Sequence, residues 1–195
     1  AHGSRPDLGV DAIRHAGRFL AELDRYEARL AEVEPHPLLP APSVHAGTIE
    51  GGTVPPVYPE SCRLVVERRT LPGESAEEVL EEFRELVLGL GERVADLDVQ
   101  VGLGLHRAGT EVAPETDLVL GLREACRAEG IEKELAGMSA WVDAALLNDA
   151  GVPAVCFGPG SIDQAHADEE WVRTDEMEAA ARVLERFARS LLALG

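Results

Sequence analysis

The sequence is poor in cysteine and in basic residues, and it has no long apolar run. Its three cysteines are an odd number without a CxxC spacing, which argues against a disulfide framework and against a cysteine metal site. Only 18 Lys and Arg stand against 36 Asp and Glu, and the net charge of −18 argues against nucleic acid or an anionic membrane as partner. No apolar run reaches the roughly 18–20 residues of a membrane span, and no signal peptide is recognisable. These absences predict a soluble, cytoplasmic protein with free thiols.

Several catalytic motifs are absent as well. No GxSxG occurs, so nothing indicates a serine nucleophile, and no glycine-rich motif is present that would hold a phosphate. Motifs that carry two metal ligands at short spacing, such as HxH, HExxH or HxD, do not occur away from His166. A metal ligand in this sequence would therefore depend on partners elsewhere in the protein.

The first half of the chain alternates helical and strand patterns. Ser75 and Glu78 have the spacing of a capping box at a helix start. The strictest apolar–polar alternation in the chain predicts a strand over residues 97–105. The predicted order is helix, strand, strand, helix, strand, over residues 7–34, 44–49, 62–69, 75–91 and 97–105. One more strand ahead of the first helix would complete a β-α-β-β-α-β, ferredoxin-like sandwich with a single helical layer.

The second half has an alternating α/β character, and a boundary is predicted near residues 107–114. Two domains follow, 1–107 and 108–195. The second is expected to contain two helices, a strand and a final helix, over residues 116–128, 142–149, 153–157 and from 174 onward.

His166 is the first candidate for chemistry. It follows the strand predicted at 153–157, and the turn Gly158, Pro159 and Gly160 lets backbone approach a ligand closely. Glu170 could hold the second ring nitrogen of a metal-bound imidazole. The plainer interpretation is an exposed loop histidine, and one histidine alone does not make a site.

Three further residues have a functional and a plainer interpretation. Arg69, at the polar end of a strand, could bind a substrate carboxylate, or could pair with Glu67 or Glu74. His2 could belong to a site or to a frayed terminus. Asp143 stands near a helix start, where capping is its commonest duty.

Three stretches, taken in order, resemble the M20 metallopeptidase family of acetylornithine deacetylases, succinyl-diaminopimelate desuccinylases, aminoacylases and carboxypeptidases. They are AHGSRPDLGVDAI, EGGTVPPVYPESCRLVVERRTLPGES and WVDAALLNDAGVPAVCFGPGSIDQAHADEEWV. The resemblance extends over nearly the whole chain. It implies a β-α-β-β-α-β lid domain, here without its first strand, that forms a homodimer. The C-terminal part of an α/β zinc-peptidase domain would follow it.

The same resemblance implies two zinc ions per complete subunit, with cobalt or manganese able to substitute. His166 matches a zinc ligand and Glu170 the acidic residue that follows it. His2 matches a lid histidine that stabilises the oxyanion of the tetrahedral intermediate across the dimer. Arg69 matches an arginine that binds the substrate carboxylate, and Asp143 and residues 158–160 match the substrate pocket.

The implied reaction is hydrolysis of an amide bond next to a carboxylate, on an N-acyl amino acid or a dipeptide. A dipeptidase or carboxypeptidase of the same family is the alternative, and the isolated chain could be an inactive dimerisation fragment, because the general base and the other metal ligands are not in it. Two positions depart from the family pattern. Pro56 stands where many members have Asn, and Val142 where Thr is usual, so the substrate does not transfer from those members.

Overall fold

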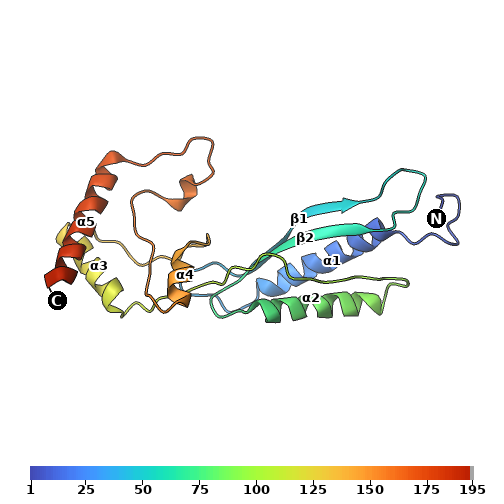
Figure 1. Ribbon diagram of the computed structural model, residues 1–195, viewed down its shortest axis with the longest axis horizontal. Coiled ribbons are helices and arrows are strands. Elements are labelled where there is room, and N and C mark those ends of the chain that lie inside the picture. Colours follow the sequence, from blue (N-terminus) through green and yellow to red (C-terminus); the bar gives the residue numbers. More distant parts are fainter. Residues whose placement is uncertain (194–195) are drawn as a thin grey trace. The chain divides into compact units, whose positions relative to one another are not determined.

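The computed structural model describes residues 1–193 and contains two compact units, Ala1–Gly109 and Thr110–Gly195 (Figure 1). Helices and a small antiparallel sheet confirm the predicted mixed α/β class. The assignment of residues 1–107 to a lid and of 108–195 to part of a catalytic domain stays a prediction. Within the described part of the chain, no helix combines the length and the apolar character needed to cross a membrane.

The first helix, α1, extends over Ala12–Leu30, shorter at both ends than predicted. Asp11 caps its start, because its carboxylate accepts a hydrogen bond from the backbone N–H of Arg14 at 3.0 Å. The residues before Asp11 form turns instead. After α1, the prolines between residues 35 and 42 keep the chain out of helical conformation.

Two antiparallel strands follow, β1 (Ser43–Gly51) and β2 (Cys62–Arg69), with an irregularity in register between Ala46 and Thr48. Alternate side chains of β2 are half-buried and exposed along its whole length, as the sequence pattern predicted. The sheet therefore has one covered face and one open face.

Helix α2 (Ala76–Gly91) begins with the predicted capping box. The Ser75 side chain accepts from the Glu78 N–H at 3.2 Å, and the Glu78 carboxylate accepts from the Ser75 N–H at 2.9 Å. Both α1 and α2 lie on the same side of the sheet in Figure 1. Their shared core consists of Leu23, Tyr26, Leu30 and Val44, with Phe19, Leu20, Val66, Phe83 and Leu86 packed around it.

The strand predicted over residues 97–105 is absent from the structure. Strands are held by backbone hydrogen bonds to a neighbour, and no described segment supplies them here. Leu103 and Leu105 are exposed accordingly. Alternation predicted which side chains could share a face, but it carries no information on whether a neighbouring strand exists.

The second unit is built on α3 (Asp117–Ala128) and α5 (Thr174–Ala193), which pack together. Gly121 allows the close approach, since a Cβ there would lie 2.9 Å from the Phe187 ring. Glu129 joins the two helices by accepting from Arg186 at 2.7 Å and from Arg182 at 3.2 Å. These bonds, chiefly that of Arg186, lower the pKa of the Glu129 carboxyl.

Between α3 and α5 lie the short helix α4 (Ala144–Asp149) and the 3₁₀ turn η1 (Ile162–Gln164). No strand forms at 153–157, where one was predicted, and these residues have no regular secondary structure. The Asn148 side chain holds the beginning of this segment, donating to the Ala154 carbonyl at 3.0 Å and accepting from the Ala154 N–H at 2.7 Å.

Candidate functional site

The segment that carries His2 is fixed to the loop between β1 and β2. His2 forms an isolated antiparallel bridge with Val57. The flanking hydrogen bonds run from the Gly3 N–H to the Pro56 carbonyl at 2.7 Å and from the Tyr58 N–H to the Ala1 carbonyl at 2.9 Å. His2 is exposed but its backbone is held on both sides, so the interpretation as a frayed terminus is wrong.

The imidazole of His2 makes two contacts with Ser4, both at Nδ1. The Ser4 Oγ lies 2.8 Å from Nδ1, and the Ser4 backbone N–H donates to it at 3.1 Å. Sequence reasoning passed over Ser4. The available signal was a small hydroxyl residue two positions after a histidine, a spacing at which serine commonly binds local groups.

Gly9 lies close to the Tyr58 ring, where a side chain would not fit. A Cβ at residue 9 would lie 2.4 Å from the Tyr58 ring. Only a residue without a side chain allows the turn over residues 5–9 to pack on that ring, so Gly9 helps to keep the His2 segment against the β1–β2 loop.

Arg69 lies at the end of β2 on the open face of the sheet. Its guanidinium donates to Glu67 at 2.8 Å, and the Glu67 carboxylate also lies 3.8 Å from Nε2 of His45 on β1. The plainer alternative for Arg69, an ion pair with Glu67, is therefore present. The side chain is still 45% exposed, which leaves it accessible to an anionic ligand.

A buried polar cluster lies beneath Arg69 and was not predicted. The Arg68 side chain, 5% exposed, pairs with Glu74, donates to the Arg69 carbonyl, and donates from Nε to the Tyr26 hydroxyl at 2.9 Å. Tyr26 in turn donates to Glu82 of α2. Burial lowers the pKa of Arg68, but the bonds to Tyr26 and Glu74 outweigh it and the net shift is upward. Burial, followed by the bond to Glu82, raises the pKa of Tyr26 to about 12.

His2 and Arg69 lie at opposite ends of the sheet. His2 bridges Val57, in the loop that leads into β2, whereas Arg69 is the last residue of that strand (Figure 1). The seven residue steps from Cys62 to Arg69 extend about 23 Å at ~3.3 Å per residue. One subunit therefore does not bring these two side chains together.

In the second unit, His166 occupies a left-handed backbone conformation with φ of 64°. Such values are uncommon outside glycine and are concentrated at functional sites. The Glu170 carboxylate supports the conformation by accepting from the His166 backbone N–H at 2.5 Å. We expected Glu170 to hold a ring nitrogen of His166. It binds the backbone instead, so it shapes the loop around the imidazole.

Gly160 has φ of +85°, and its N–H donates to the Glu176 carboxylate in the first turn of α5 at 3.0 Å. This bond ties the Gly158–Gly160 turn to α5, a role for Glu176 that the sequence did not suggest. Asp143 precedes α4 and is exposed, and its side chain makes no capping hydrogen bond. Asp143 therefore does not cap α4 through its side chain.

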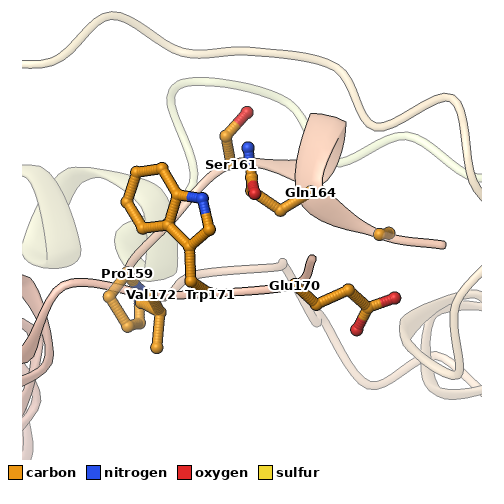
Figure 2. Close-up of a pocket in the computed structure, with 8 residues that line it drawn as sticks. Pro159, Ser161, Gln164, Glu170, Trp171 and Val172 are labelled. Atoms are coloured by element: carbon orange, nitrogen blue, oxygen red, sulfur yellow. The ribbon is translucent and has the colours of Figure 1, made fainter. Parts of the chain in front are cut away.

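Residues of the loop between Pro159 and Val172 line an open hollow of about 440 Å³. In Figure 2 the Trp171 indole lies above Pro159 and Val172 and beside Ser161 and Gln164, while the Glu170 carboxylate points away from the indole. The lining residues are Pro159, Gly160, Ser161, Gln164, Ala165, Glu170, Trp171 and Val172. His166 does not line this hollow, although its neighbour Ala165 does.

A metal site depends on how many ligand side chains lie together. A catalytic zinc takes three protein ligands. Over residues 1–193, no three His, Cys, Asp or Glu side chains are placed together to hold a metal ion. The described residues by themselves do not fit a zinc site, although His166 remains available as a single ligand.

Comparison with known proteins agrees with the arrangement of the first unit. Residues 1–93 match the family model described as the peptidase dimerisation domain, M20_dimer. Over 187 residues, 95% of its length, the chain is 30% identical to acetylornithine deacetylase of Myxococcus xanthus. Residues 1–93 are thus a dimerisation domain of the M20 peptidase family. The chain spans about half the length of the curated relatives it matches, 48% in this case.

Two solved structures share the fold of this chain. They are a tripeptidase of Staphylococcus aureus, with a TM-score of 0.71 and 17% identity, and the aminopeptidase PepT of Bacillus cereus, with 0.70 and 21%. Each likeness covers 96% of this chain and 47% of the other. At these identities the likeness concerns the fold alone, and the roles of the site residues stay predictions.

Proposed function

We propose that the protein containing this chain hydrolyses an amide bond next to a carboxylate, as a deacylase of N-acyl amino acids. The observation that carries the proposal is the 30% identity to acetylornithine deacetylase over 95% of the chain, which includes both units. The substrate would be a small molecule, and the free thiols of Cys62, Cys126 and Cys156 suit a reducing cytoplasm.

His2 and Arg69 have separate parts in this proposal. Arg69 binds the substrate carboxylate through its planar guanidinium, a local cation on a chain of net charge −18. His2 donates a hydrogen bond to the oxyanion that forms when water attacks the amide carbonyl. Because the two lie at opposite ends of one sheet, we infer that His2 serves the site of the partner subunit in a homodimer.

The second unit would supply the remaining groups of this chain. His166 is proposed as one zinc ligand in the complete protein, with two zinc ions per subunit that cobalt or manganese could replace. Residues 158–160 and Asp143 would line the substrate pocket.

The lack of a ligand cluster in the described residues favours a second function for the isolated chain: a dimerisation module without hydrolytic activity. Two measurements on the isolated chain test this second function: the zinc content per chain after dialysis, and the mass in solution by analytical ultracentrifugation. A dimer with essentially no zinc supports it. A dialysis-resistant content near two zinc ions with amide hydrolysis contradicts it.

The proposed reaction is tested on the full-length protein with N-acetyl amino acids, with the matching N-acetyl amines that lack the carboxylate, and with dipeptides. We expect hydrolysis of the N-acetyl amino acids and little of the amines, because only the former can pair with Arg69. Preferential hydrolysis of dipeptides would favour the peptidase alternative instead. No hydrolysis of any of them would overturn the proposal.

The division of His2 and Arg69 between subunits has its own test. His2→Ala and Arg69→Gln are each expected to be nearly inactive. A mixed dimer should regain one complete site, so a randomly exchanged equal mixture should recover about a quarter of wild-type activity. If both residues served the same subunit's site, every site in the mixture would keep one defect and no activity would return.

A further inference from the structure

Both contacts of the His2 ring fall on the same nitrogen, and one of them has a fixed direction. The Ser4 hydroxyl, 2.8 Å from Nδ1, can donate or accept. The Ser4 backbone N–H, 3.1 Å from Nδ1, can only donate. Nδ1 must therefore be the acceptor.

This assignment fixes the tautomer of the neutral ring. A neutral imidazole has one N–H and one lone pair, so a lone pair at Nδ1 places the proton on Nε2. In the other tautomer, an Nδ1–H would face the Ser4 N–H and two donors would oppose each other. With Nδ1 as acceptor, the Ser4 hydroxyl also donates to it.

The surrounding backbone keeps Ser4 in this position. The Arg5 N–H donates to the His2 carbonyl at 2.9 Å, which closes a turn around Ser4. The bond from Gly3 to Pro56 at 2.7 Å anchors that turn to the β1–β2 loop. The ring and its partner thus belong to one fixed element.

From these contacts we propose that Ser4 is a positioning residue, which holds His2 in the tautomer that presents an Nε2–H. The inference rests on the function proposed above for His2, because an oxyanion needs a hydrogen-bond donor. The opposite tautomer would present a lone pair at Nε2 and repel the developing negative charge. Ser4 itself touches neither substrate nor oxyanion, and acts only through the ring.

The tautomer can be observed directly by two-bond ¹⁵N–¹H correlation spectra of this 195-residue chain, recorded at about pH 8.5, where ordinary histidines are neutral. The His2→Ala spectrum assigns the His2 signals. We expect wild-type His2 to have its proton on Nε2. Ser4→Ala removes one of two donors to Nδ1 and should raise the ratio of the Nδ1–H to the Nε2–H form about five-fold, and Ser4→Thr should restore the wild-type ratio.

His36 is an internal reference in the same spectra. Its Nδ1 accepts from the Leu38 N–H at 3.1 Å, and Ser4→Ala should leave its signals unchanged. A wild-type His2 protonated mainly on Nδ1 would overturn the proposal. So would a Ser4→Ala ratio identical to that of the wild type.

Kinetics of the full-length protein then test the consequence. Ser4→Ala should lower kcat by at most about three-fold with KM unchanged, because a five-fold change in the ratio lowers the fraction of a mainly Nε2–H ring by no more than that. Ser4→Thr should recover kcat, and Ser4→Ala should have no further effect on a His2→Ala background. An equal loss of kcat from Ser4→Ala with and without His2 would overturn the positioning role. A wild-type protein that hydrolyses no amide would contradict the proposed function alone, since the NMR result reports the tautomer independently of activity.

Discussion

Arg68 donates a hydrogen bond to the main-chain carbonyl of Arg69, although the two side chains lie on opposite faces of the sheet. The Arg68 side chain is 5% exposed and the Arg69 side chain 45%. The buried guanidinium also pairs with Glu74, whose carboxylate accepts from the Leu71 N–H. The covered face of the sheet therefore holds the backbone from which the exposed arginine projects.

Glu74→Gln tests the strength of this buried pair. The substitution leaves the Arg68 guanidinium buried without its carboxylate, and we expect a loss of about 1.5–3 kcal/mol in the free energy of unfolding, as for a hydrogen bond to a charged group. Urea denaturation followed by circular dichroism measures it. Glu67→Gln is the matched control, because its pair with Arg69 is exposed and should cost less than about 1 kcal/mol. Equal losses in the two variants would contradict the distinction between the faces.

The contribution of Tyr26 to the stability of the protein should be lost at high pH. Burial and the bond to Glu82 raise its pKa to about 12, from the ordinary value of 10. A raised value in the folded state means that the contribution is complete below pH 10 and disappears as pH rises to 12. Tyr26→Phe should therefore destabilise the protein by about 1–3 kcal/mol at pH 8, and the gap to wild type should narrow from pH 10 to 12. Urea unfolding of both proteins across this range measures the gap, and a constant gap would refute the assignment.

Local signals in the sequence predicted most of the first unit. The helical stripe of α1 and the alternation of β2 report which side chains face the core, and the Ser75–Glu78 spacing located the start of α2 within a residue. These are properties of a few neighbouring residues. The strand expected at 97–105 was wrong because pairing depends on a backbone elsewhere, about which alternation is silent.

The candidate site divides in the same way. His2, Arg69 and His166 were chosen as candidates from their motifs, and the positions of Arg69 at a strand end and of His166 in a loop could be predicted from the sequence. Their supporting groups could not. Ser4 contacts the ring through a local turn, and Arg68 contacts Tyr26 of α1 and Glu74 in the loop before α2. The short spacing of Ser4 from His2 was a weak signal, whereas no residue spacing encodes the contacts of Arg68.

Gly9→Ala should loosen the segment that carries His2. The added Cβ would lie 2.4 Å from the Tyr58 ring, so the turn or the ring must move, at a cost of about 1–3 kcal/mol. Gly17→Ala on α1 is the control, since nothing lies within 4 Å of its Cβ and alanine should stabilise the helix by up to about 1 kcal/mol. Thermal unfolding of both variants gives the comparison. A neutral Gly9→Ala would show that the segment is not held by this packing.

Gly160→Ala tests the backbone of the loop that leads to His166. A φ of +85° is strained for any residue with a Cβ, and this Cβ would also lie 3.3 Å from Val172. We expect a loss of about 1–2 kcal/mol, measured by urea unfolding through tryptophan fluorescence, which reports the second unit because both tryptophans lie in it.

Gly158→Ala, two residues earlier, separates strain from a general need for glycine in this turn. Gly158 has no positive φ, and nothing lies within 4 Å of the position that a Cβ would take there. The free energy of unfolding of Gly158→Ala should therefore differ from that of the wild type by less than about 0.5 kcal/mol. If the turn required glycine at both positions, both variants would lose the same amount of stability. A loss confined to Gly160 would instead locate the strain at the residue whose N–H binds Glu176, and would show that the loop carrying His166 is anchored to α5 through one backbone conformation.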